Sequence, residues 1–243
     1  MFNWLKNSPL PSTEKQTEKA ICPYCSHELE KFPARKQKCP SCGKEFLVRT
    51  HYLSKQKMVL TDKDAVRYDS EKEKYYTDKS LIDGLKLNIN VDKNAVDKLV
   101  EKTREELTKK FGQPAALGDI AWGVANRMTV DAAKKGDLGL VNMIQFQMAL
   151  YLHNSGKDCN YIRVASFDTE LQNYKKSRVT AGVGISAANC CERCKHLNGQ
   201  TYMLDEAIKE KILPCKECTN KLNPEAPTGW CVCCYIPLID MKS

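Results

Sequence analysis

The spacing of hydrophobic residues through the middle of the chain predicts a series of α-helices. Segment 93–111 places an apolar side chain every three or four residues, with Lys and Glu between them, which is the period of a helix with one buried face. That face would hold Val96, Leu99, Val100, Thr103, Leu107 and Phe111. Further helices are expected over 115–128, 137–153 and 159–176, with breaks near Gly112–Pro114, Gly136 and Gly156. Because short connections favour antiparallel neighbours, these segments predict an all-α bundle.

The pattern changes on both sides of these helices. Thr61, followed three residues later by Asp64, resembles a capping box and would start a charged helical segment. Residues 178–186 have the composition of a strand, and residues 1–19 are polar with two prolines. The predicted fold is therefore mainly α with small β modules. Its expected parts are a flexible leader over 1–19, a β module over 20–55, a helical domain over 61–177 and a Cys-rich α+β region over 178–243.

Length and composition are typical of a globular protein. The chain has 243 residues, of which 42% are hydrophobic and 28% are charged, so it can bury a core without disulfides. No apolar run approaches the roughly 18 residues that a membrane-spanning helix requires. The first eleven residues also lack the apolar stretch of a secretory signal. We therefore expect no membrane partner and a cytoplasmic location.

The cysteines are concentrated in two short stretches. Of thirteen, four lie between residues 22 and 42 and eight lie between residues 190 and 234, with Cys159 alone between the two groups. The total is odd and C-x-x-C spacing recurs. A disulfide framework fits this pattern poorly, whereas metal-binding thiolates in a reducing compartment fit it well.

The N-terminal stretch contains two C-x-x-C pairs separated by thirteen residues. Cys22 and Cys25 form the first pair, Cys39 and Cys42 form the second, and Gly43 follows where a left-handed turn residue is useful. Two such pairs supply the four thiolates of a tetrahedral zinc site. With this spacing the segment resembles the zinc-ribbon superfamily, which implies a small β-hairpin module. A closed four-thiolate site leaves no position for a substrate, so we expect a structural role for the metal.

The C-terminal stretch predicts a second zinc site. Cys191 and Cys194 form one C-x-x-C pair, and Cys215 and Cys218 form another after twenty residues. Between the pairs, 204–211 reads as a short helix with acidic residues in its first turn and lysines near its end. The last group of cysteines is Cys231, Cys233 and Cys234. These residues could be alternative ligands of the second zinc site, ligands of a third metal site with His196 or Cys190, or buried thiols, and the sequence leaves the three possibilities open.

The residues around this second site also carry a resemblance to a known family. Leu197, Gly199 and Tyr202 follow the first pair as L-x-G-x-x-Y, and Pro214 precedes the second pair. Over about residues 180–237 the chain resembles the C-terminal motif of the tailed-phage head-morphogenesis, or minor head protein, family. Cys215 stands where that family has a histidine, and the cysteines at 231–234 correspond to its closing Cys-rich element. The resemblance implies a phage or prophage origin, phage structural proteins as partners, and a location in the bacterial host cell or the virion.

The positive charge lies mainly in the first quarter of the chain. Residues 1–60 carry 11 Lys and Arg against 5 Asp and Glu, whereas residues 61–158 carry 16 of each. A basic ribbon with aromatic residues among its cations could bind nucleic acid through phosphate contacts and stacking, and an acidic protein could use the same surface. The candidate contact residues are Lys31, Arg35, Lys36 and Lys38.

The chain contains no H-E-x-x-H, P-loop, G-x-S-x-G or Rossmann motif, so we assign no catalytic residue. We expect a non-enzymatic protein with two zinc sites, and an open third, that binds nucleic acid or protein through its basic ribbon. The family resemblance adds a link to phage head morphogenesis. Two alternatives remain. One is a metal-dependent nuclease with a zinc-stabilised C-terminal fold, for which only His196 and Asn198 are available near the cysteines, and the other is a structural virion component.

Overall fold

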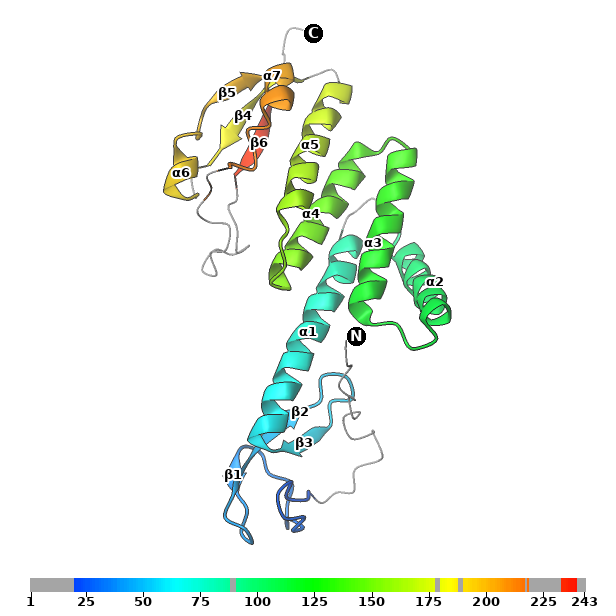
Figure 1. Ribbon diagram of the computed structural model, residues 1–243, viewed down its shortest axis with the longest axis vertical. Coiled ribbons are helices and arrows are strands. Elements are labelled where there is room, and N and C mark those ends of the chain that lie inside the picture. The colour runs from blue at the N-terminus through cyan, green and yellow to red at the C-terminus, as the bar shows by residue number, and fades with distance from the viewer. Residues whose placement is uncertain are drawn as a thin grey trace, which may run out of the picture. The chain divides into compact units, whose positions relative to one another are not determined.

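A computed structural model describes residues 20–87, 91–177, 180–187, 190–216, 218 and 233–239. It confirms a mainly helical chain with a small N-terminal sheet and a C-terminal α+β region (Figure 1). The chain divides into two compact units, Met1–Glu73 and Lys74–Ser243, with the boundary inside helix α1 (Asp62–Lys86). The predicted leader over 1–19 and Cys231 lie outside the described residues. Among the helices that are described, none combines the length and the apolar character needed to cross a membrane.

The N-terminal unit is built on an antiparallel sheet of β1 (Gln37–Lys38), β2 (Glu45–Thr50) and β3 (Lys57–Leu60), in that order. The first part of α1 packs on it through Tyr68, which is fully buried. The Tyr68 hydroxyl donates to the Thr50 carbonyl at 2.8 Å and accepts from the Tyr52 amide at 2.8 Å. These bonds satisfy backbone groups at the end of β2 and so fix the helix to the strand.

Helix α1 begins with the capping arrangement expected from the sequence. The Thr61 hydroxyl accepts from the Asp64 amide at 3.1 Å and donates to the Asp64 carboxylate at 2.7 Å. This side-chain pair satisfies one of the amides that a helix start leaves without an intrahelical partner. The helix extends to Lys86, well past its charged first half, because Leu81, Ile82 and Leu85 enter the core of the second unit.

The second unit contains the bundle helices α2 (Lys93–Phe111), α3 (Leu117–Lys134), α4 (Leu138–Asn154) and α5 (Asn160–Ser177). Helix α2 has the bounds expected from its periodicity. Asp92 caps its start by accepting from the Asn94 amide, and Gly112 ends it with φ 68°. Gly136 and Gly156 also have positive φ, so the expected breaks between helices are confirmed.

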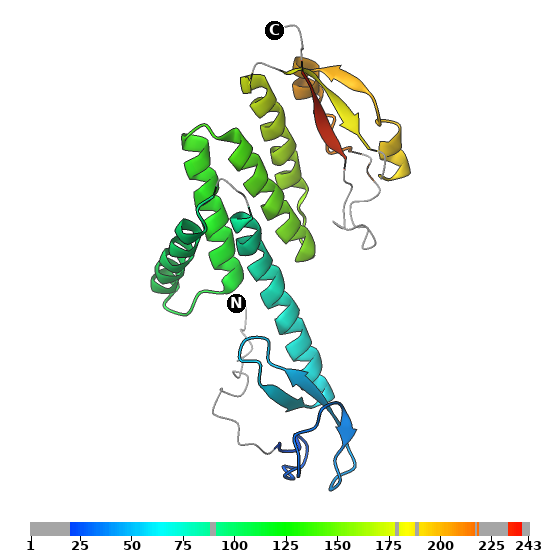
Figure 2. The same cartoon turned by 180° about the vertical axis from the view of Figure 1, so that it is seen from behind.

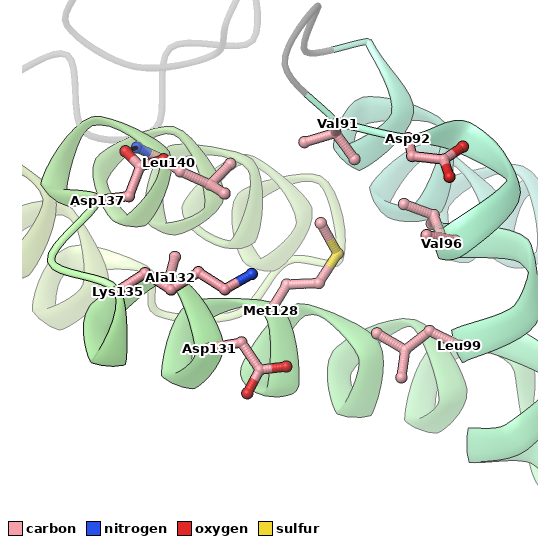
Figure 3. A pocket seen from close by; sticks show the side chains of 11 residues that line it. Val91, Asp92, Val96, Leu99, Met128, Asp131, Ala132, Lys135, Asp137 and Leu140 are labelled. Carbon is pink, nitrogen blue, oxygen red and sulfur yellow. Dashed lines mark hydrogen bonds between the residues drawn. The ribbon is translucent and has the colours of Figure 1, made fainter.

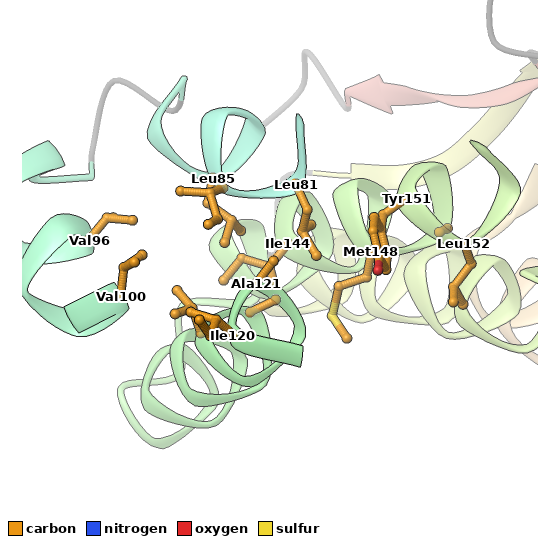
Figure 4. Close-up of a cluster of buried hydrophobic side chains, with 14 of the residues drawn as sticks. Leu81, Leu85, Val96, Val100, Ile120, Ala121, Ile144, Met148, Tyr151 and Leu152 are labelled. Carbon is orange, nitrogen blue, oxygen red and sulfur yellow. The ribbon is translucent and has the colours of Figure 1, made fainter. Parts of the chain in front are cut away.

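The bundle core is formed by aliphatic side chains from α1 to α4, among them Leu85, Val96, Ile120 and Ile144 (Figure 4). Two expectations for this region are wrong. Helix α3 continues past residue 128 to Lys134, because Ala132 keeps the buried face of the helix in contact with its neighbours. Phe111 is 59% exposed, since it is the last residue of α2 and the helix ends before it can turn inward.

A buried polar contact lies among these apolar side chains. The Tyr151 hydroxyl donates to the Asp78 carboxylate at 2.9 Å, and both residues are buried. A Cβ at Gly118 would lie 2.7 Å from the Tyr151 hydroxyl and 2.8 Å from the Asp78 Oδ1. Glycine at position 118 therefore makes room for this hydrogen bond beside the first turn of α3.

The C-terminal region of this unit is a sheet with order β5-β4-β6 (Figure 2). Its strands are β4 (Thr180–Ser186), β5 (Thr201–Met203) and β6 (Cys234–Ile239). The strand expected at 178–186 is confirmed over 180–186, and residues 178 and 179 lie outside the described residues. Val183, Ile185 and Tyr235 are buried in one cluster with Leu171 of α5. Two short helices complete the region, α6 (Glu192–Lys195) and α7 (Leu204–Glu210), and the second confirms the helix expected after residue 204.

Candidate metal centres

The two N-terminal C-x-x-C pairs form matching turns. In the first, the Cys22 carbonyl accepts from the Ser26 amide at 3.0 Å, and in the second the Cys39 carbonyl accepts from the Gly43 amide at 2.9 Å. A second backbone bond closes each turn, from Cys22 to His27 and from Cys39 to Lys44, both at 2.9 Å. Each turn is therefore closed by its own backbone hydrogen bonds within six residues.

The turns bring four sulfur atoms to one place. The sulfurs of Cys22, Cys25, Cys39 and Cys42 all lie within 4.8 Å of one another. Between the two turns, Cys22 lies 3.9 Å from Cys42 and Cys25 lies 3.7 Å from Cys39. A zinc ion with four bonds of about 2.3 Å in tetrahedral geometry has sulfurs about 3.8 Å apart. The cluster therefore has the dimensions of a zinc-ribbon-like four-thiolate site.

The backbone around this cluster favours thiolates. Burial raises the pKa of Cys39, but amide hydrogen bonds from Cys42 and Ser41, with contacts to the neighbouring cysteines, outweigh it and lower the pKa to about 6. A metal ligand must be the thiolate, so this environment prepares Cys39 for binding near neutral pH.

The candidate basic residues lie on the surface of the same unit. Lys31, Arg35, Lys36 and Lys38 are all exposed, and Lys36 forms an ion pair with Glu45 at 3.3 Å. Lys44 lies over the Tyr24 ring, 5.1 Å from its centroid. Cations next to a four-thiolate centre offset its net negative charge. They also give the surface a positive charge, which attracts phosphate groups.

The second centre joins three buried cysteines. The sulfurs of Cys191, Cys194 and Cys218 lie within 4.8 Å of one another, with Cys191 3.4 Å from Cys194 and 3.9 Å from Cys218. Cys191 is the residue before α6 and Cys194 lies within this helix. The Cys194 amide donates to the Cys191 carbonyl at 2.9 Å. These three thiols could bind a metal ion, with a fourth position left to another ligand.

Cys215 and His196 lie outside this group of three. Cys215 is half-buried and His196 is exposed, and both line a cavity of about 320 Å³ together with Lys211 and Lys216. Two assignments therefore stay predictions: Cys215 as the fourth ligand of this zinc site, and His196 as a ligand of a third metal site.

The side chains of two further cysteines are in contact with each other. The Cys190 and Cys233 sulfurs are 3.0 Å apart, and both side chains are buried in the cluster that contains Leu197, Leu213 and Tyr235. This contact was not visible in the sequence, because no spacing rule relates residues 190 and 233. It follows from the pairing of β4 with β6, in which Ser186 lies opposite Cys234.

Cys234 and Cys159 have different surroundings. Cys234 is an exposed residue, yet desolvation of its thiol raises its pKa, and the nearby Glu170 carboxylate raises it further. Burial likewise raises the pKa of Cys159 inside the bundle core. Both thiols therefore lose their proton less readily than a free cysteine does. Cys234 as a ligand of a further metal site stays a prediction.

A cavity of about 330 Å³ lies between the start of α2, the end of α3 and the start of α4 (Figure 3). Val96, Leu99 and Met128 form much of its wall. The carboxylates of Asp92 and Asp137 at its rim already accept from the amides of helix starts, at Asn94 and Leu140. These two carboxylates therefore serve the fold, and we assign no chemistry to the cavity.

Both cysteine clusters could hold a metal ion. The N-terminal four-cysteine cluster agrees with a zinc-ribbon-like module, and a Cys-rich cluster is present at the C-terminal end. Comparison with protein-family models, curated proteins and solved structures finds no match.

Proposed function

We propose that this protein binds one zinc ion through Cys22, Cys25, Cys39 and Cys42, and a second through Cys191, Cys194 and Cys218 with one more ligand. The single observation that carries the proposal is the N-terminal cluster, whose four sulfurs lie within 4.8 Å of one another. Thiolate ligands in tetrahedral geometry select zinc over hard cations such as magnesium or calcium. Both ions hold chain segments together, and neither needs a catalytic role.

Metal analysis of the full-length protein tests this proposal. Purified under reducing conditions, it should contain two zinc ions per chain by native mass spectrometry. Cys25→Ser should lose one ion and Cys194→Ser the other, while Cys234→Ser should retain both. Cys234 is a suitable control because it is exposed and lies outside the group of three sulfurs. A wild-type protein without zinc would contradict the proposal.

We propose further that the N-terminal unit binds nucleic acid. The support is its exposed basic surface, formed by Lys31, Arg35 and Lys38, next to a cluster whose dimensions suit zinc. Phosphate contacts made by Lys and Arg supply affinity that does not depend on base sequence and falls with salt. An acidic protein is the other partner that would suit this surface.

Fluorescence anisotropy with labelled single- and double-stranded DNA, at two salt concentrations, tests nucleic-acid binding. Replacing Lys31, Arg35 and Lys38 with Ala should weaken binding and lower the slope of log affinity against log salt by roughly 0.7 to 0.9 per lost contact. Removing three exposed lysines from α2, Lys98, Lys102 and Lys109, changes the net charge equally and should have little effect. Equal losses in both triple variants would indicate a non-specific charge effect and contradict the proposal.

A virion role is a third proposal, and it rests on the minor-head resemblance. The motif residues Leu197, Gly199 and Tyr202 form a compact turn and strand after α6: Leu197 is buried, Gly199 has φ 78° and Tyr202 pairs with Val183. Such a motif suits a structural zinc module at a protein interface. Mass spectrometry of purified phage particles tests it, and absence of the protein from particles would contradict it.

A further inference from the structure

We infer that Cys190 and Cys233 form a reversible disulfide that closes around the second metal centre. The inference concerns two cysteines to which the zinc proposal gives no role. For its effect on the metal, it rests on the proposed zinc binding at Cys191, Cys194 and Cys218.

The distance between the two sulfurs separates this pair from the metal clusters. Sulfurs that share a tetrahedral zinc ion are about 3.8 Å apart. Four of the sulfur pairs in the two clusters are 3.4 to 3.9 Å apart, and all the sulfurs of each cluster lie within 4.8 Å of one another. The Cys190 and Cys233 sulfurs are 3.0 Å apart. A disulfide bond is about 2.05 Å long, so a movement of about 1 Å would bring them to bonding distance.

The backbone holds the two residues in this position. Strand β6 begins at Cys234, opposite Ser186 at the end of β4, so Cys233 lies at the same end of the strand pair as the segment that follows β4. The Cys190 amide donates to the Ala187 carbonyl at 3.3 Å, which keeps Cys190 near that end. Their proximity therefore results from strand pairing.

The bond would enclose the second metal centre. Residues 190 and 233 flank a segment that contains Cys191, Cys194 and Cys218, and the first of these follows Cys190 directly. Closing this loop restricts the unfolded chain, so the metal ligands separate less readily. The disulfide would thus slow the release of the bound zinc, and we refer to this effect as the latch.

The chemistry needs an oxidant, and a low-molecular-weight disulfide supplies it. One of the two thiols, as thiolate, attacks a sulfur of the oxidant; its S–S bond breaks, one thiol of the oxidant leaves, and a mixed disulfide forms. The second cysteine then attacks the protein sulfur of the mixed disulfide and releases the other thiol. The protein loses two protons and two electrons, and the oxidant takes them up to become two thiols. Both side chains are buried, so reducing conditions and limited access keep the pair as thiols until an oxidant is present.

Alkylation of the zinc-loaded full-length protein, after treatment with oxidised glutathione, tests the bond. We expect one cross-link between Cys190 and Cys233 by peptide mapping with fragmentation, while the metal ligands become alkylated once the zinc is chelated under denaturing conditions. Cys190→Ser and Cys233→Ser should abolish this cross-link, and Cys234→Ser should retain it. If both cysteines in the wild type remain fully alkylated, or Cys233 bonds to another cysteine, the inference is overturned.

Zinc release tests the latch in the same samples. A chelator should remove the second zinc at least about tenfold more slowly after oxidation than before, and a reductant should restore the original rate, because loop closure stabilises the folded segment. An unchanged rate would overturn the latch. A reduced Cys233→Ser protein that has lost one zinc would identify Cys233 as a ligand and would also overturn it. Failure of the zinc proposal is distinguishable, because the untreated wild-type protein would then contain no zinc.

Discussion

Ser26 and Gly43 occupy the same position in the two N-terminal turns, and both have left-handed backbone conformations, with φ 58° and 72°. Each residue lies four positions after the first cysteine of its pair, and its amide donates to the carbonyl of that cysteine. The turn that aims two sulfurs at one point therefore depends on a residue that tolerates positive φ. One turn uses glycine for this purpose and the other accepts a strained serine.

This equivalence predicts opposite effects of two substitutions. Gly43→Ala should weaken zinc binding by about 1–2 kcal/mol, because an L-residue is strained at this φ even though no atom lies within 4 Å of the new Cβ. Ser26→Gly should be neutral or should strengthen binding slightly by relieving strain. Competition with a chromogenic chelator measures both. Equal affinities in Gly43→Ala and wild type would show that the turn does not depend on this conformation.

Removal of the metal should unfold the N-terminal unit before the bundle. The core around the N-terminal cysteines is small, and two of its fully buried members, Cys22 and Cys39, are proposed ligands. Structural zinc contributes roughly 10–16 kcal/mol of apparent folding free energy in small modules. After chelation under reducing conditions, hydrogen exchange should lose protection over residues 20–60 while α3 and α4 remain protected. Added zinc should restore the protection; protection that survives chelation would contradict a structural role.

Gly118→Ala should destabilise the bundle by about 1–3 kcal/mol, since the new methyl group would overlap the Tyr151 hydroxyl and the Asp78 carboxylate. Gly139→Ala provides a matched control on α4. There the nearest atom to a new Cβ is 3.7 Å away, and alanine is the better helix former. Denaturant unfolding followed by the helical circular dichroism signal should show a lower midpoint for the first variant and an equal or higher midpoint for the second. Similar midpoints for both would mean that the core adapts to the extra methyl group.

The same buried contact predicts a loss of stability at high pH. Burial, with the hydrogen bond to Asp78 and the charge of its carboxylate, raises the pKa of Tyr151 to about 12. A free tyrosine has a pKa near 10, so the folded state favours the protonated form. This contribution is fully present below about pH 10 and is lost as the pH rises through about 12. In this window the free energy of unfolding of the wild type should therefore fall relative to that of Tyr151→Phe. Parallel curves would contradict the assignment, because Tyr235 also has a pKa raised to about 12 and remains in both proteins.

The helices could be predicted from the sequence where their limits are set locally. Helix α2 begins at Asp92 and ends at Gly112, and both residues act within one turn of their own position. The end of α3 could not be predicted in this way, since contacts of Ala132 with other parts of the bundle continue the helix past residue 128. Exposure of Phe111 was missed for a related reason, because periodicity alone does not show where a helix stops being covered.

Among the cysteines, too, contacts set by nearby residues could be predicted, and contacts set by the tertiary fold could not. The N-terminal cluster could be anticipated from spacing, because each pair closes its own turn and only one further step brings the pairs together. The contact between Cys190 and Cys233 could not, since it depends on the register of β6 against β4. Spacing also paired Cys215 with Cys218, but of these two only Cys218 lies with Cys191 and Cys194 in the described part of the chain.

The closed backbone of each N-terminal turn has a consequence for how the metal is acquired. Because the Cys22–Cys25 and Cys39–Cys42 turns are each held by their own hydrogen bonds, each is a bidentate chelator in its own right. If zinc binds as proposed, one turn would take up the ion with its two cysteines and the other turn would supply the remaining two ligands. Metal binding and folding of the module would then be one process, and its rate would depend on how often the two turns meet.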